Sequence, residues 1–299
     1  MSFVKRCYAC WAGSEFVMYQ NVFASIKRHP VLTYFVMTIG ISWGGVFLAA
    51  GGVDGFPANA QEIKTLLPIV APLLAVGPVF SGILLTGLLD GRTGLADFAA
   101  RLLRWRVRLR WYALSLFLTP LLAALTLLGL SLFSSVFTPG ILVTKDKTGL
   151  IIPALAAGLV AGLFEEPGWT GFVTPRLRQR HGVFAAGLIL GLMWGIWHLI
   201  VAVWGSGTPS GDFSVLLFLP QFFFYAAVLP AYRVLMTWAY DHTHSLFVAI
   251  LMHLSLTGNV LFIFMPQGIP ELLLLAWYVS LSGALWGLVW LVLNPKKKE

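Results

Sequence analysis

Residues 149–175, GLIIPALAAGLVAGLFEEPGWTGFVTP, form a long apolar run whose only charges are the adjacent carboxylates of Glu165 and Glu166. A membrane-spanning helix needs about 20 apolar residues. The part before Glu165 is short for a span, yet residues 167–175 are again uncharged. We therefore expect one span here, with both carboxylates at membrane depth and a kink or helix end at Pro167.

The rest of the chain has the composition of a membrane protein. Of its 299 residues 58% are hydrophobic and 11% are charged, whereas soluble domains carry roughly 25% charged residues. The expected fold class is an all-α polytopic membrane protein of about eight transmembrane helices, with residues 1–299 as a single membrane domain. The predicted spans are residues 31–50, 65–89, 112–137, 149–164 with its continuation to 175, 183–204, 213–232, 245–265 and 272–293.

The lysines and arginines predict the orientation, because short cytoplasmic loops collect them. With eight spans, one side receives only Lys64, Lys145 and Lys147. The other side receives the clusters in 5–6, 27–28, 92–110, 176–180 and 296–298, together with Arg233 at the expected end of the sixth span. We therefore expect a multi-pass protein of the inner (plasma) membrane with both termini cytoplasmic.

The net charge of +8 indicates a lipid partner and not a nucleic acid. The basic residues flank apolar segments, where anionic lipid attracts them, and no soluble basic domain is present to bind nucleic acid. Residues 95–111 mix large apolar side chains with arginines. This pattern suits a helix that lies in the cytoplasmic interface of the bilayer.

Few ionisable groups fall inside the predicted spans, and such groups are functional candidates because burying them in lipid is unfavourable. They are Glu165, Glu166, His198 and His253. At about 1.5 Å per helical residue, Glu165, His198 and His253 lie roughly 16, 22 and 12 Å from the cytoplasmic ends of their spans. The three side chains can therefore meet near the middle of the bilayer.

This set of residues suits hydrolysis. A carboxylate and a neutral imidazole that share one water can deprotonate it, and His253 with Thr257, four residues later on the same helix face, can donate hydrogen bonds to an oxyanion. Glu165, His198 and His253 could equally hold a divalent metal such as zinc with an open position for water. Because adjacent helical residues diverge by about 100°, we expect only one of Glu165 and Glu166 to face the site.

Three ordered motifs resemble those of the CPBP family of intramembrane proteases, which includes CAAX prenyl endopeptidases and the bacteriocin-processing or immunity proteins of the Abi group. The motifs are Glu165-Glu166-Pro-Gly-Trp-Thr170, Trp194-x-x-x-His198 and His253-x-x-x-Thr257. They lie within residues 150–262, the predicted catalytic core.

The resemblance implies a role for each motif residue. Glu165 would activate a water with His198 as its partner, Glu166 would support the pair, and His253 with Thr257 would stabilise the oxyanion. Two positions depart from the family pattern, because Thr170 stands where an arginine is usual and Thr257 where an asparagine or aspartate is usual. The first departure removes an ion-pair partner of the glutamates, and the second weakens a hydrogen-bond donor.

The leading hypothesis is a metalloprotease-like intramembrane endopeptidase that cleaves a membrane-associated protein or peptide. The alternative is a catalytically inactive relative that acts as an immunity protein or a partner-binding membrane scaffold, as Thr170 and Thr257 would allow. A transporter is the third hypothesis for the same residues. The absence of paired, interrupted spans in matching halves of the sequence counts against it.

Overall fold

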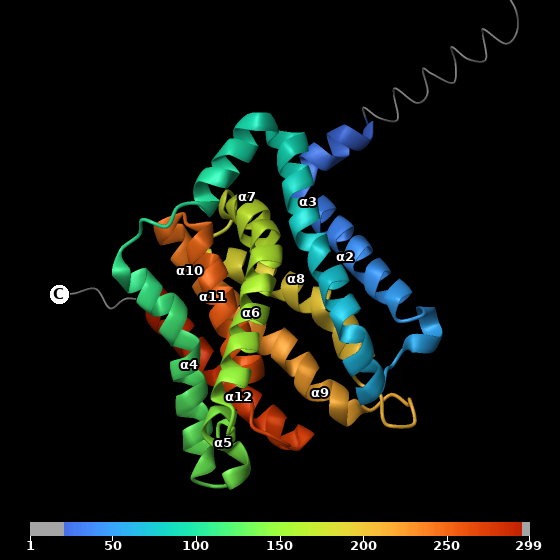
Figure 1. The fold of residues 1–299 in the computed structure, drawn as a ribbon. Helices are drawn as coiled ribbons and strands as arrows, with labels where there is room; N and C mark the ends of the chain where they lie inside the picture. Colours follow the sequence, from blue (N-terminus) through green and yellow to red (C-terminus); the bar gives the residue numbers. More distant parts are fainter. Residues whose placement is uncertain (1–20, 295–299) are drawn as a thin grey trace, which may run out of the picture.

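The structure, a computed structural model, describes residues 21–294 (Figure 1). Its helices are α2 (Pro30–Ala49), α3 (Ala60–Leu102), α4 (Leu109–Ser131), α5 (Gly140–Val143), α6 (Lys147–Glu166), α7 (Thr174–Arg178), α8 (Val183–Trp204), α9 (Val215–Phe223), α10 (Leu229–Thr243), α11 (Leu246–Gly258) and α12 (Glu271–Leu293). Two 3-10 turns, Gly52–Gly55 and Ser135–Phe137, and three π-helical segments, η3 (Pro167–Val173), η4 (Phe224–Val228) and η5 (Asn259–Ile263), join some of them.

Eight helical segments in this range are long and apolar enough to cross a membrane, which confirms the predicted fold class. Several are composite: α6, η3 and α7 form the segment Lys147–Arg178, and α9, η4 and α10 form Val215–Thr243. The chain is thus a multi-pass membrane protein whose fourth span continues past the two glutamates, as expected.

Two helices extend beyond the ends of the predicted apolar runs. The α10 helix continues from 232, where the sixth run ended, to Thr243. The α3 helix continues to Leu102 and bends at Gly91, whose φ of 63° few residues other than glycine adopt. The prediction of an interfacial helix over residues 95–111 is therefore wrong for the second half of that range. Residues 104–108 are non-helical, and their alternating basic and apolar order suits an extended link.

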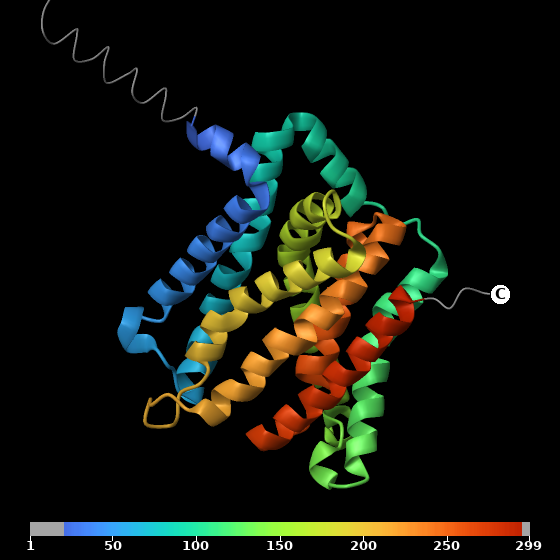
Figure 2. The same ribbon diagram turned by 180° about the vertical axis from the view of Figure 1, so that it is seen from behind.

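The helices that carry the candidate residues lie in the middle of the bundle (Figures 1 and 2). The α2–α3 pair forms one edge and α4 with α12 forms the other, while α6 packs on α11 and α8 packs on α10 between them. The seventh span, Leu246–Ile263, is 67% buried, against 22% for the first. Its position makes α11 the central helix of the bundle.

Glycines set the close approach of α6 to α11. A Cβ atom on Gly158 would lie 2.5 Å from the carbonyl oxygen of Leu254, and one on Gly162 would lie 2.8 Å from that of Ile250. Small residues allow such backbone contacts between membrane helices, where packing and not water exclusion drives association. This contact places the end of α6, with its two glutamates, directly beside His253.

Candidate active site

The two glutamates end α6 at a change of helix type. Pro167 has no backbone N–H to continue the α-helical hydrogen bonds, and the chain passes into the π-helical segment η3. Trp169 and Phe172 of this segment pack on Tyr34 of α2 at ring-centroid distances of 5.2 and 5.4 Å. These buried aromatic contacts fix η3 against α2, so that Glu165 and Glu166 both point into the bundle, with 6% and 0% of their surfaces exposed.

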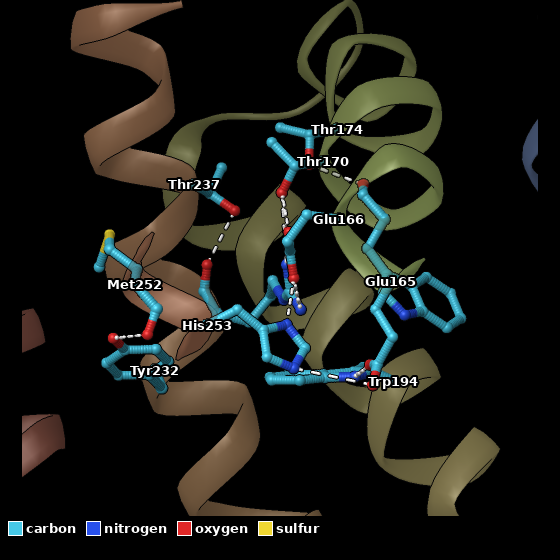
Figure 3. A network of polar contacts seen from close by, with 11 residues as sticks. Glu165, Glu166, Thr170, Thr174, Trp194, Tyr232, Thr237, Met252 and His253 are labelled. Atoms are coloured by element: carbon cyan, nitrogen blue, oxygen red, sulfur yellow. Dashed lines mark hydrogen bonds and ion pairs between the residues drawn. The ribbon is translucent and has the colours of Figure 1, made fainter. Parts of the chain in front are cut away.

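Glu166 is held by four hydrogen bonds (Figure 3). Arg233 of α10 donates from Nη1 to Oε2 at 2.8 Å and from Nη2 to Oε1 at 2.9 Å. Thr170 donates its hydroxyl to Oε2, and Nδ1 of His253 lies 2.7 Å from Oε1. A carboxylate among so many donors is ionised and is fixed in position. Glu166 therefore anchors the site and has no free lone pair directed at a substrate.

Arg233 is the residue whose role the sequence analysis missed. It was expected at the cytoplasmic end of the sixth span, but the structure buries it completely in an ion pair with Glu166. The expectation failed because α10 continues for ten residues beyond Arg233. A signal was present: residues 234–240 are uncharged, just as residues 167–175 are after the glutamates.

Arg233 supplies an ion pair that Thr170 cannot. Thr170 donates to Glu166, and Nη1 of Arg233 lies 3.4 Å from the Thr170 hydroxyl. The guanidinium thus reaches the same carboxylate from α10 instead of from η3. The glutamates keep an ion-pair partner, contrary to the expectation drawn from Thr170.

Glu165 has fewer partners and is the freer of the two carboxylates. Its Oε2 accepts a hydrogen bond of 2.7 Å from the indole nitrogen of Trp194, and its Oε1 lies 3.7 Å from Nε2 of His253. Both glutamates therefore face the site, and the expectation that only one would do so is wrong. The imidazole of His253 has one nitrogen on each side of its ring. It can therefore face both carboxylates, although the two glutamates point in different directions from one helix.

Trp194 connects the remaining residues. The guanidinium of Arg233 lies 4.0 Å from the centre of its ring, a cation–π contact. The imidazoles of His253 and His198 pack against the same indole at centroid distances of 5.1 and 5.7 Å. One side chain thus orients Glu165 through its N–H group and packs on Arg233 and both histidines.

His198 lies beside the hydrogen-bonded cluster and does not join it. Its Nδ1 is 2.9 Å from the backbone oxygen of Trp194, and its ring stacks on Tyr225 at 4.7 Å. Because a carbonyl oxygen only accepts, Nδ1 of His198 carries the proton and Nε2 keeps a lone pair. Thr257, one turn after His253 on α11, is partly buried. Among the hydrogen bonds of residues 21–294, none involves the Thr257 hydroxyl.

The charges of the cluster balance with one additional proton. Glu166 and Arg233 cancel, and the hydrogen bond to Glu166 requires a proton on Nδ1 of His253. A further proton, on either Glu165 or Nε2 of His253, makes the four residues neutral. Buried charges are tolerated when they are paired in this way. A proton at that place would lie between Glu165 and His253, whose Oε1 and Nε2 atoms are 3.7 Å apart.

The zinc site considered for Glu165, His198 and His253 stays a prediction. In the part of the chain that the structure describes, no group of three His, Cys, Asp or Glu side chains is placed to hold a metal ion. Nδ1 of His253 faces Glu166 and Nδ1 of His198 faces a backbone carbonyl, so Nε2 is the nitrogen that each histidine could offer to a metal. The chemistry below is derived for protein side chains and water.

Comparison with known proteins finds a similarity in this part of the chain. Residues 147–258 match the model of the Rce1-like family, described as type II CAAX prenyl endopeptidase Rce1-like. Residues 147–258, called the Rce1-like core below, are thus similar to this family. The match contains every candidate site residue and confirms the resemblance drawn from the three motifs.

The similarity extends beyond the Rce1-like core. The CAAX prenyl protease 2 of Methanococcus maripaludis is 25% identical over 243 residues, which cover 79% of this chain and 85% of that protein. The aligned length shows that the similarity to this relative reaches beyond residues 147–258.

Proposed function

We propose that this chain is an intramembrane endopeptidase in which Glu165 activates the attacking water. The observation that carries the proposal is the pair formed by Glu165 and His253, whose Oε1 and Nε2 atoms lie 3.7 Å apart. The other ring nitrogen of His253 is held by Glu166, which is itself paired with Arg233. The Rce1-like match supports the class of enzyme. It also supports a substrate that is itself associated with the membrane.

One further proton, placed between Glu165 and His253, would give each residue a role. With that proton on Nε2 of His253, Glu165 is an ionised carboxylate that can act as a base, and His253 is an imidazolium that can donate to a carbonyl oxygen. Glu166 stabilises the imidazolium, as the carboxylate does in a carboxylate–histidine dyad. The lone pair on Nε2 of His198 can accept a hydrogen bond from the same water.

The reaction follows from these roles. Glu165 takes a proton from water, the oxygen bonds to the carbonyl carbon of the scissile peptide, and His253 donates to the oxyanion that forms. The carbon–nitrogen bond then breaks, and the proton held by Glu165 passes to the leaving amine. Thr257 is proposed as a second donor to the oxyanion.

The structure weakens one reason for an inactive scaffold. That alternative rested on Thr170 and Thr257, and Arg233 supplies the ion pair that Thr170 cannot. Thr257 remains the departure on which the alternative rests. The relative is named a CAAX prenyl protease, so a prenylated CAAX peptide is the first substrate to test.

The test is cleavage of such a peptide by the purified chain in proteoliposomes containing ¹⁸O-labelled water. Hydrolysis predicts a shortened peptide whose new carboxyl group carries the label, detected by mass spectrometry. An identical preparation of His253→Ala controls for contaminating proteases. If neither the prenylated nor the unprenylated peptide is cleaved, the proposal is contradicted and the scaffold alternative is favoured.

A further inference from the structure

A second site lies at the end of the bundle that the positive-inside pattern assigns to the cytoplasm. A cavity of about 940 Å³ opens there between the first turn of α2, the bend of α3, α7 and the end of α10. We call it the basic basin, and its lysine and arginine side chains are Lys27, Arg28, Arg101, Arg176, Arg178 and Arg180.

The basin has more positive than negative charge. Three of its arginines are paired with its three aspartates: Arg101 with Asp97 at 2.8 Å, Arg176 with Asp90 at 2.5 Å and Arg178 with Asp241 at 2.8 Å. Lys27, Arg28 and Arg180 form no ion pair within residues 21–294. Three histidines, His29, His181 and His244, also line the cavity. The basin therefore favours an anion.

The wall of the basin continues into an apolar strip on α2. Pro30 starts this helix, and Leu32 lies in the lining. Leu32 and Val36, one turn apart, are 60% and 62% exposed. An anion bound beside Lys27 and Arg28 thus has an exposed apolar path running from it into the membrane-spanning part of α2.

We propose that the basic basin binds the phosphate of an anionic lipid headgroup, with an acyl chain along Leu32 and Val36. Guanidinium groups match phosphate oxygens in charge and geometry, and the basin lies where the spans end, at headgroup depth. The apolar strip favours a lipid over free phosphate. The site is separate from Glu165 and His253, so the inference does not depend on the proposed catalysis.

The test is calorimetric titration of the full chain in neutral detergent with short-chain phosphatidylglycerol, phosphatidylcholine or inorganic phosphate. We expect phosphatidylglycerol to bind more tightly than both other probes. The variant Lys27→Gln/Arg28→Gln/Arg180→Gln should weaken its binding by about a hundredfold, at roughly fivefold for each basic residue. The control Arg104→Gln/Arg106→Gln/Arg108→Gln removes the same charge from the same end outside the basin and should bind like the parent.

A second variant distinguishes the two sources of phosphate. Leu32→Gln/Val36→Gln should weaken binding of phosphatidylglycerol and leave that of inorganic phosphate unchanged. The proposal would be overturned if inorganic phosphate and the lipid bound with equal affinity. It would also be overturned if the basin variant and the control variant lost the same affinity for the lipid. If the triple variant melts below the parent, Arg180→Gln alone carries the test, with the expected loss of about fivefold.

Discussion

At the scale of single residues, the site depends on a buried arginine that sits on a different helix from the glutamate it pairs with. Arg233 and Glu166 are both fully buried and joined by two hydrogen bonds. Removing one partner of such a pair leaves an uncompensated charge, which lowers the free energy of unfolding by about 3–5 kcal/mol. The pair therefore holds His253 in place as well as stabilising the fold.

Exchanging two side chains tests this role. Arg233→Thr should lower the unfolding free energy by about 3–5 kcal/mol and abolish cleavage. Combining it with Thr170→Arg should recover most of the stability and most of the cleavage rate. Position 170 already contacts Glu166, and the new guanidinium can approach this carboxylate from η3. Chemical denaturation and peptide cleavage are the measurements. A single Arg233→Thr variant with parental stability and rate would contradict the assigned role.

Thr257 allows a milder test of oxyanion stabilisation. Thr257→Val should lower the cleavage rate because it removes one hydrogen-bond donor to the oxyanion. Loss of one such donor typically removes about 2.7–4 kcal/mol of transition-state stabilisation, and the loss here should not exceed that range because His253 remains. Thr257→Asn should keep or raise the rate, because an amide is a stronger donor. Initial rates of peptide cleavage at saturating substrate distinguish the two. Parental rates in both variants would remove Thr257 from the site.

The motifs predicted that Glu165 and His253 meet, but they could not predict the pairing of their side chains or that His198 lies beside the hydrogen-bonded cluster. The apolar runs around Glu165, Glu166 and His253 placed these side chains at membrane depth, and the structure brings them into contact. The pairing of Glu166 with Arg233 depends on how far α10 extends and how it packs on α8. Neither property is visible in a hydropathy pattern.

At the scale of helices, the α6–α11 contact sets the geometry of the site. Gly162→Ala would place a Cβ atom 2.8 Å from the Ile250 carbonyl, so we expect a loss of about 1–3 kcal/mol from overpacking and a lower cleavage rate as Glu165 shifts from His253. Gly129→Ala in α4 is the matched control, since nothing lies within 4 Å of its added Cβ. It should be neutral or stabilising by up to about 1 kcal/mol. Equal effects of the two substitutions on melting would count against the contact.

Spans were predictable from sequence because bilayer thickness sets their length. The ends of the spans were less predictable. The α3 and α10 helices continue past the apolar runs because Asp90 and Asp241 form ion pairs with arginines of α7, Arg176 and Arg178. These pairs make polar helix ends stable within the fold, and a pattern along one helix cannot reveal them.

At the scale of the whole molecule, both ends of the chain are predicted to be cytoplasmic, although residues 1–20 and 295–299 lie outside the described range. Gln61 lies in the first turn of α3, Arg104 follows the other end of this helix, and both are exposed. In a background lacking Cys7 and Cys10, Gln61→Cys should react with a membrane-impermeant thiol reagent added to intact cells. Arg104→Cys should react only after the membrane is opened. The reverse pattern would invert the topology.

The most direct test of the central claim is cleavage by Glu165→Gln, because the amide keeps the volume and the hydrogen bond from Trp194 but cannot take a proton from water. The variant should retain the parental melting temperature and bind the peptide, yet form no labelled product in proteoliposomes. Hydrolysis at the parental rate by a folded Glu165→Gln protein would show that Glu165 is not the base.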